Sequence, residues 1–91
     1  TDERAVRRED GSWLLDGTLR VHELEDLLGS AAPIPERGYE TLAGFMLDRL
    51  GHIPGAGETF EWGGWRFEVA DMDANRIDKV LATPPTGSDE G

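Results

Sequence analysis

Three oxygen-bearing side chains late in the chain have the spacing of calcium ligands. Asp71, Asp73 and Asn75 match the first three ligand positions of an EF-hand loop. The rest of that loop is missing, because Arg76 occupies the position of the required glycine and Ala82 that of the bidentate glutamate. We therefore interpret the segment as a polar hairpin turn in which Asp73 and Asn75 tolerate the turn dihedrals.

The two histidines do not complete a metal motif either. His22 is followed by Glu23, but the zinc-protease pattern needs a second histidine four residues after the first, where this chain has Asp26. Because the chain has no cysteine, a zinc site would need His22, His52 and carboxylates to converge. The sequence predicts no metal site, and it predicts that both histidines face solvent or adjoin helix ends.

Motifs for nucleotides and nucleophiles are also incomplete. Gly55-Ala56-Gly57 begins like a dinucleotide fingerprint, but Phe60 replaces the third glycine and a strand is predicted to follow. The single lysine, Lys79, lies in a predicted strand and not in a phosphate-binding loop. The serines, which lack a glycine elbow and a neighbouring histidine, are Ser12, Ser30 and Ser88. The chain is therefore predicted to have no catalytic residues and not to be an enzyme.

The charge of the chain excludes further classes of partner. Its formal net charge is −10, and most of the acidic excess lies in residues 21–91. Such a surface repels nucleic-acid backbones and anionic lipid headgroups, so we predict binding to neither. The absence of cysteine favours a reducing compartment. No apolar run reaches the roughly 20 residues that a membrane-spanning helix needs.

The first third of the chain predicts a hairpin followed by a short helix. The turn-rich residues 9–12 separate two short strands, one around Val6 and one over residues 13–15. Thr18 is the expected N-cap of the helix, and Gly29 is the expected left-handed residue that ends it. The apolar residues on its predicted buried face are Val21, Leu24, Leu27 and Leu28.

A proline-containing extended connector, residues 30–38, leads to a second predicted helix at about residues 40–50. Gly51 is expected to end this helix, and Pro54 prevents its resumption. Gly44 lies inside the helix, where glycine costs up to about 1 kcal/mol relative to alanine, so we expect close backbone packing there. The apolar stripe of the helix consists of Leu42, Phe45, Met46 and Leu50.

The last third predicts three strands. Apolar and polar residues alternate over residues 60–62 and 65–69, and Gly63-Gly64 between them suits a type I′ hairpin. A turn at residues 73–75 and a strand over residues 76–83 follow. The predicted class is α+β in the order β-β-α-α-β-β-β, a largely antiparallel sheet with both helices packed on one face. We expect at least two of Trp13, Trp62 and Trp65 to lie in the core.

A longer pattern runs through these elements. Its most specific portion is Thr41-x-x-Gly44 followed by Leu50-Gly51-x-Ile53-Pro54-x-x-Gly57-Glu58, which fixes a helix, its packing glycine, its end and the entry to the next strand. With these segments the chain resembles the transporter-associated domain of the CorC/HlyC family. The resemblance covers residues 4–83, and residues 84–91 are expected to form a disordered tail. The family-signature residues, to which we assign structural roles, are Gly17, Thr41, Gly44, Gly51, Pro54, Gly57 and Gly64.

The resemblance implies a C-terminal soluble domain on the cytoplasmic side of an integral membrane protein, following a membrane domain and paired cystathionine-β-synthase-type nucleotide-sensing domains. Such proteins are associated with magnesium and cobalt transport or efflux. The implied role is a non-catalytic accessory domain, without a bound cofactor, that modulates ion transport. It would contact the other cytosolic domains of the parent transporter or a second copy of itself, and it would meet the membrane only through the parent.

A second function stays open at this point. The fold implied by the resemblance is related to an FAD-binding class, so the alternative is a ligand-binding module for a flavin, an adenine nucleotide or a divalent cation. Flavin absorbance after purification, or a nucleotide-dependent rise in melting temperature, would favour this alternative.

Overall fold

Two hairpins form the sheet, and both pair with the strand that comes last in the sequence. The computed structural model describes residues 4–29, 34 and 40–85. All strand pairs in this part of the chain are antiparallel, and the strand order is β1-β2-β5-β4-β3. The elements are β1 (Ala5–Arg7), β2 (Trp13–Asp16), α1 (Val21–Leu28), α2 (Leu42–Leu50), β3 (Thr59–Trp62), β4 (Trp65–Asp73) and β5 (Arg76–Thr83). The predicted α+β class and element order are confirmed.

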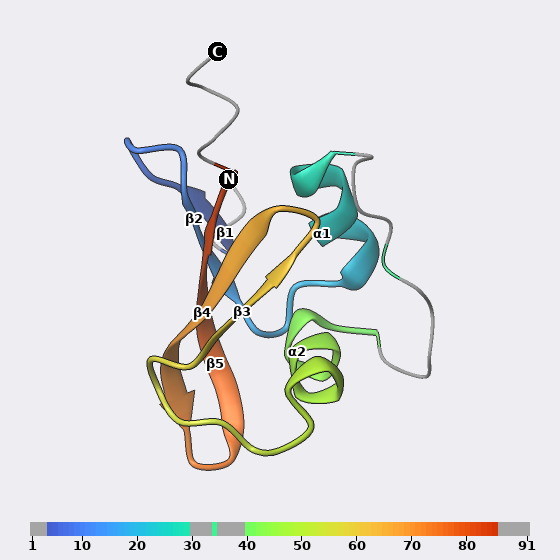
Figure 1. Cartoon of the computed structure of the whole chain (residues 1–91), viewed down its shortest axis with the longest axis vertical. Coiled ribbons are helices and arrows are strands. Elements are labelled where there is room, and N and C mark those ends of the chain that lie inside the picture. The colour runs from blue at the N-terminus through green and yellow to red at the C-terminus, as the bar shows by residue number, and fades with distance from the viewer. Residues whose placement is uncertain (1–3, 30–33, 35–39, 86–91) are drawn as a thin grey trace.

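Both helices cover the same face of the sheet (Figure 1). Alternate residues of each strand point to this face because side chains in a strand have a period of two. The cross-strand pairs Leu15↔Val80 and Val80↔Val69 show the register of one such row. The fully buried side chains from the helices and the central strands are Leu24, Leu42, Phe45, Met46, Leu15, Phe67, Val69 and Val80.

The prediction for the start of the first helix is wrong. Thr18 does not cap α1, because the N-cap is Arg20, whose backbone is extended and whose N–H donates to Glu23 Oε1 at 3.0 Å. The chain first makes a turn through residues 16–18 and buries Leu19, which is 1% exposed. The apolar spacing did identify the buried positions Leu24 and Leu28, but the capping residue was misassigned.

The backbone dihedrals at three turns can be compared with the turn conformations that the sequence predicts. Gly63 and Gly64 both have positive φ, at 61° and 86°, as the predicted type I′ hairpin requires. Gly29 also has positive φ, but its ψ of −173° lies outside the left-handed helical region, so that part of the prediction is wrong. The β4–β5 turn lies between Asp73 and Arg76, where the sequence places a polar turn, and its residue with positive φ is Ala74, at 57°.

The second helix begins at Leu42, two residues later than predicted, and Thr41 is its N-cap. Gly51 ends it in the left-handed conformation, with φ 79° and ψ 7°, and donates its N–H to the Leu47 carbonyl at 2.9 Å. This end is confirmed. Gly44 lies half-buried in α2, and close backbone packing at this residue stays a prediction.

The tryptophans are buried to different degrees. Trp65 is 9% exposed and belongs to the core, while Trp13 and Trp62 are half-buried and pack against it. Of the predicted connector, the structure describes only Ile34, which is 5% exposed and donates its N–H to Glu25 Oε2 at 2.6 Å. The other connector residues and residues 86–91 of the predicted tail lie outside the described part of the chain. No helix in the described ranges has the length and apolar composition needed to cross a membrane.

Candidate functional site

One carboxylate fixes the turn between β2 and α1. Asp16 Oδ1 accepts hydrogen bonds from the backbone N–H of Thr18 at 2.9 Å and from its hydroxyl at 2.8 Å, while Lys79 Nζ donates to Asp16 Oδ2 at 3.1 Å. The hydrogen bond from the Thr18 backbone is the largest cause that lowers the pKa of Asp16, and the Lys79 ammonium adds to the effect. The carboxylate is therefore ionised at neutral pH and links the turn to β5.

Gly17 lies where the end of β2 closely approaches β5 and α2. Its N–H donates to the Asp78 carbonyl at 2.9 Å, and its carbonyl accepts the Ala43 N–H at 2.9 Å. A β carbon at this position would overlap the carbonyl oxygen of Ile77 and would lie 3.4 Å from the β carbon of Ala43. A residue without a side chain is therefore required where the three elements meet.

The chain that leaves this turn pairs with the chain that enters α2. Leu42 donates its N–H to the Leu19 carbonyl at 2.8 Å, and Arg20 and Thr41 form an isolated antiparallel bridge. Thr41 Oγ1 then accepts the Gly44 N–H at 3.2 Å, which caps α2. The starts of both helices are thus held side by side by backbone hydrogen bonds.

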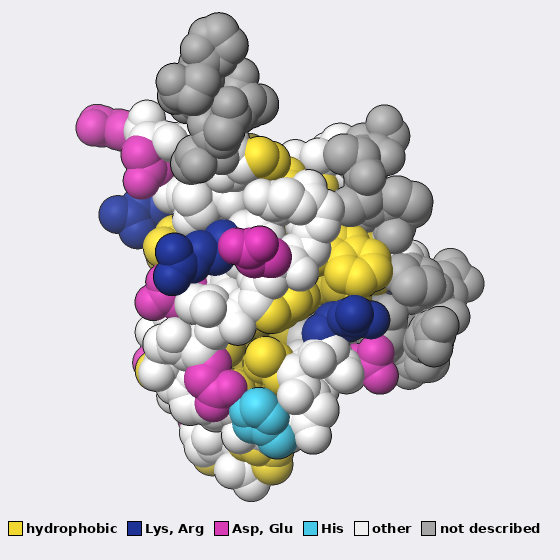
Figure 2. Space-filling view, in the orientation of Figure 1, with side chains coloured by type: hydrophobic (Ala, Val, Ile, Leu, Met, Phe, Trp, Pro, Cys, Tyr) yellow, Lys and Arg dark blue, Asp and Glu magenta, His cyan; other side chains and the backbone are white. Residues whose placement is uncertain are grey.

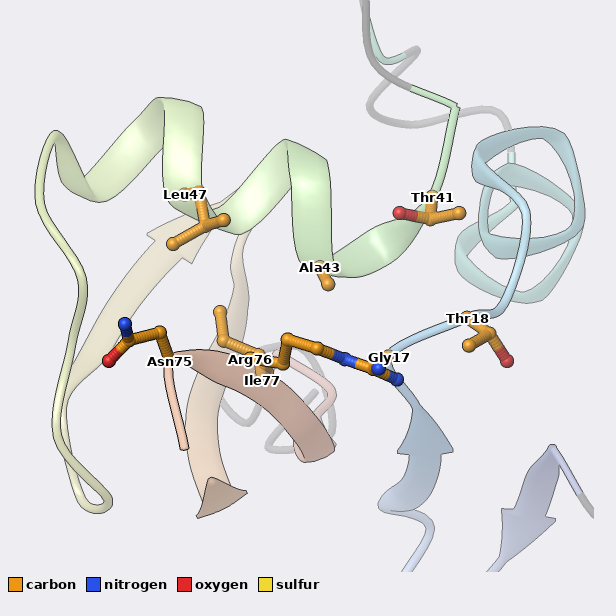
Figure 3. Close-up of a pocket in the computed structure, with 8 residues that line it drawn as sticks. All are labelled: Gly17, Thr18, Thr41, Ala43, Leu47, Asn75, Arg76 and Ile77. Carbon is orange, nitrogen blue, oxygen red and sulfur yellow. The ribbon is translucent and has the colours of Figure 1, made fainter. Parts of the chain in front are cut away.

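A hollow of about 180 Å³ opens between this pairing and the β4–β5 hairpin (Figure 3). In Figure 3 the side chain of Arg76 extends along the hollow toward Gly17, below Ala43. Sites for drug-sized ligands occupy roughly 300–1,000 Å³, so this hollow has the size for one side chain and not for a nucleotide. Its lining residues are Gly17, Thr18, Thr41, Ala43, Leu47, Asn75, Arg76 and Ile77.

Arg76 is the arginine among the residues that line the hollow, and it takes no part in the ion pairs of the described residues. Arg4 pairs with Glu23 at 2.9 Å and Arg20 with Glu40 at 3.5 Å, and all four side chains are exposed enough that each pair contributes little to stability. Arg76 makes no ion pair with any residue that the structure describes. Figure 2 shows acidic side chains interspersed with Lys and Arg side chains on the face that it displays.

A second polar cluster lies in the connection from α2 to β3. His52 Nε2 is 2.7 Å from Glu58 Oε1, and the Gly55 N–H donates to Glu58 Oε2 at 2.9 Å. The hydrogen bond with Glu58 is the largest cause that raises the pKa of His52. The Gly55 N–H is the largest cause that lowers the pKa of Glu58, followed by His52. The cluster bridges the loop over residues 51–58 most firmly when the imidazole is protonated.

This cluster predicts a defined pH dependence. His52 has a raised pKa, so its stabilising contribution is complete below its ordinary value of 6.5 and is lost as pH rises through the raised pKa. Glu58 has a lowered pKa, so its contribution is present above its ordinary value of 4.5 and is lost as pH falls through the lowered pKa. Glu58→Gln is therefore expected to reduce the pKa of His52, measured by NMR titration of its ring protons.

The matched control for that titration is Glu61→Gln, which removes an exposed carboxylate on β3 that forms no hydrogen bond or ion pair with the histidine. It is expected to leave the pKa of His52 in place. Equal pKa values for His52 in the Glu58→Gln variant and the unaltered protein would contradict the assigned pair.

Residues 6–86 match the family model of CorC_HlyC, described as the transporter associated domain. The match spans most of the chain and includes both helices, the turn at Gly17 and the β4–β5 hairpin. The chain belongs to the CorC/HlyC transporter-associated domain family. The resemblance seen in the sequence is thereby confirmed.

Relatives and solved structures agree with this assignment. The domain is 45% identical over 78 residues to the UPF0053 protein sll0260 of Synechocystis, covering 84% of this chain and 17% of that protein. It is 37% identical over 83 residues to the polyamine export protein of Escherichia coli K12, covering 90% of this chain and 18% of that protein. The chain therefore spans about a sixth of the length of these relatives.

A solved CorC/HlyC domain has the same fold. The transporter-associated domain of a Xylella fastidiosa Temecula1 hemolysin, described as in complex with Mg²⁺ and Mn²⁺, is 47% identical and has a TM-score of 0.80. The comparison covers 91% of this chain and 99% of that one, so the solved chain consists almost entirely of this domain. A domain of this family is thus a folded unit by itself.

The family-signature residues fall into two places in the CorC/HlyC fold. Gly17 and Thr41 line the hollow, and Gly44 donates its N–H to the Thr41 cap. The remaining positions shape the loops around β3: Gly51 ends α2, Pro54 is buried, Gly57 has φ 97° and donates its N–H to the Val69 carbonyl, and Gly64 turns the β3–β4 hairpin.

The cap of α2 can be tested by substitution. Thr41→Ala is expected to lower the free energy of unfolding by about 1 kcal/mol, because the Gly44 N–H loses its acceptor. In a domain of this size that corresponds to a fall in melting temperature of about 4–8 °C. Thr41→Ser keeps a hydroxyl and is expected to recover most of the loss. A serine variant that melts as low as the alanine variant would contradict the capping role.

The structure does not bring the candidate metal ligands of the sequence together. Asp71, Asp73 and Asn75 are all exposed, with the two aspartates on β4 and Asn75 in the turn beside the hollow. His22 is exposed on α1, and His52 pairs with Glu58 in a different loop. In the described part of the chain, no group of three or more His, Asp or Glu side chains is placed to hold a metal ion. Sequence reasoning missed Arg76 and Thr41 as residues of one site, because their juxtaposition depends on long-range pairing.

Proposed function

We propose that this chain is a non-catalytic accessory domain that modulates cation transport by a longer membrane protein, from the cytoplasmic side. The match to the transporter-associated family over residues 6–86 carries the proposal. The chain spans only 17–18% of the relatives described above, one of which is a polyamine export protein. In such a protein the domain would act through contacts with the remaining domains or with a second copy.

The cargo class that this proposal names is a cation. The polyamine exporter moves an organic cation, and the family resemblance points to magnesium and cobalt. The domain's own net charge of −10 does not oppose the approach of any of these ions. The ion pathway itself would belong to the membrane part of the longer protein, since no described helix of this domain is suited to span lipid.

A domain exchange tests the proposal. In the E. coli polyamine export protein, the matching 83 residues are deleted in one variant and replaced by this chain in another. Polyamine efflux is measured at equal membrane abundance. Deletion is expected to change the rate or regulation of efflux, and the replacement is expected to restore it. A third variant, in which the replacement carries the residues of this chain in scrambled order, controls for the mere presence of added polypeptide.

Two results would contradict the accessory role. Deletion could leave efflux, its regulation and the oligomeric state unchanged, which would remove any need for the domain. Alternatively, the folded replacement and the scrambled replacement could behave identically, which would show that the domain's structure has no part in the effect.

Divalent-cation binding is a second candidate function. The Xylella fastidiosa domain, 47% identical to this chain, is described as in complex with Mg²⁺ and Mn²⁺. Calorimetric titration of this domain with MgCl₂ and MnCl₂, at constant ionic strength, decides between a binding module and a purely interacting one. Saturable heat with about one ion bound per chain would favour the binding module. The flavin and nucleotide alternatives gain no support from a hollow of about 180 Å³.

A further inference from the structure

The lining side chains that can donate hydrogen bonds to an occupant of the hollow are Arg76, Thr41 and Asn75. Thr41 Oγ1 already accepts the Gly44 N–H, so its own O–H is left to donate to an occupant. The Thr18 hydroxyl already donates its hydrogen to Asp16, so it does not donate to an occupant of the hollow. The guanidinium of Arg76 supplies several N–H donors and has no ion-pair partner among the described residues. An occupant that accepts hydrogen bonds is therefore favoured.

None of the described carboxylates near Arg76 forms an ion pair with its guanidinium. Asp73 is its cross-strand partner and Asp78 lies two residues along β5, yet neither forms an ion pair with it. Asp16 on the neighbouring β2 is already paired with Lys79. In a chain with a net charge of −10, an arginine beside a hollow without a carboxylate partner is open to a carboxylate from outside.

The walls of the hollow suit the hydrocarbon part of a small side chain. Ala43, Leu47 and Ile77 line it, and Gly17 lies beside them. The volume of about 180 Å³ matches a single side chain. A carboxylate at the end of one or two methylene groups would place its apolar part against these walls and its charge on the arginine.

A carboxylate fits better than a phosphate. Phosphate groups at helix N-termini are held by free backbone N–H groups. The first N–H groups of α2 all donate within the chain, and they belong to Leu42, Ala43, Gly44 and Phe45. The fork of one guanidinium matches the two oxygens of a carboxylate without help from the backbone.

We propose that this hollow is a docking socket for a single Glu or Asp side chain, presented by a polypeptide segment outside these 91 residues. Arg76 and the Thr41 hydroxyl bind the carboxylate, and Ala43, Leu47 and Ile77 contact its methylene groups. The relatives contain about five-sixths of their length outside this domain, which supplies such a segment. This inference rests on the proposed accessory function and names the chemistry of one contact through which the domain would act.

NMR titration of the ¹⁵N-labelled domain tests the socket. The probes are acetyl-Ala-Glu-Ala-amide, the same peptide with Gln in place of Glu, and inorganic phosphate. The Glu peptide is expected to give saturable shifts at the amides of Gly17, Thr41 and Asn75, with a dissociation constant on the order of 1 mM. Arg76→Gln is expected to weaken binding about tenfold, which corresponds to about 1.4 kcal/mol.

The control variant is Arg66→Gln, which removes the same charge from an exposed position of β4 that does not line the hollow. It is expected to bind like the unaltered domain. Equal shifts with the Gln peptide, equal weakening by both arginine variants, or no saturation by the Glu peptide would each overturn the socket. Phosphate that shifts the same amides as strongly would show a small-anion site instead and would also overturn it.

The two proposals fail separately. Binding of the Glu peptide alongside a domain deletion that leaves efflux unchanged would keep the socket and remove the accessory function. Restored efflux by the replacement, alongside absent peptide binding, would keep the accessory function and remove the socket.

Discussion

Replacing Gly17 by alanine is expected to lower the melting temperature of the domain by about 12 °C or more. The added methyl group would overlap the carbonyl oxygen of Ile77, which is part of the backbone and cannot rotate away. Relief requires β2 to move from β5 or α2, which breaks the hydrogen bond to Asp78 or the one from Ala43. Overpacking of about 1–3 kcal/mol and one lost hydrogen bond of about 1 kcal/mol give about 3 kcal/mol.

Gly55→Ala is the matched control for this substitution. A β carbon at Gly55 would meet no atom within 4 Å, and its N–H can still donate to Glu58. Its effect on the free energy of unfolding is expected to stay within about 0.5 kcal/mol. Thermal unfolding followed by circular dichroism compares the two variants. Similar melting temperatures for Gly17→Ala and Gly55→Ala would contradict the close approach.

Replacing Phe45 by alanine is expected to reduce the free energy of unfolding by about 3–5 kcal/mol. Phe45 is fully buried, and its ring lies edge-on to Phe60 at 5.9 Å and to Trp62 at 5.4 Å between centroids. It therefore connects α2 with the edge strand β3, and its loss leaves a cavity and removes both ring contacts. Since the whole domain is expected to have only about 5–15 kcal/mol of stability, this is a large fraction.

Urea unfolding gives the measurement, and Phe45→Leu gives the control. Leucine refills most of the space without the ring contacts, so it is expected to recover at least half of the loss. A shared urea midpoint for the alanine variant and the unaltered domain would show that Phe45 is not a central packing residue.

Local chemistry in the sequence predicted most of the elements but not how their ends meet. The alternation over residues 65–69 and the pair Gly63-Gly64 specify a hairpin by themselves, because both signals lie within a few residues. Thr18 has the residue type of an N-cap, yet the carboxylate of Asp16 engages its hydroxyl and the helix starts later. Thr18 had two possible roles, as the helix N-cap or as the partner of Asp16, and the sequence does not show which of the two forms.

Local sequence patterns did not predict the hollow, and the reason is a different one. Gly17 was recognised as a family-signature residue, but its contact with Ile77 joins positions that only the β2–β5 pairing brings together. The same holds for Thr41 and Arg76, which come from the start of α2 and the start of β5. The unexpected positive φ of Ala74 is likewise set by the hairpin register between Asp73 and Arg76 and not by residue type.

The position of β5 in the sheet has a consequence during synthesis of the protein. β5 lies between β2 and β4, although it follows both of them in the sequence. On the ribosome, the two hairpins therefore have no shared neighbour until residues 76–83 have emerged, and each exposes an unpaired strand edge to chaperones and to other nascent chains. A ribosome that stalls before Arg76 would release a chain in which Leu15 and Phe67 lack their pairing strand, β5. Such a chain would be a substrate for proteolytic quality control.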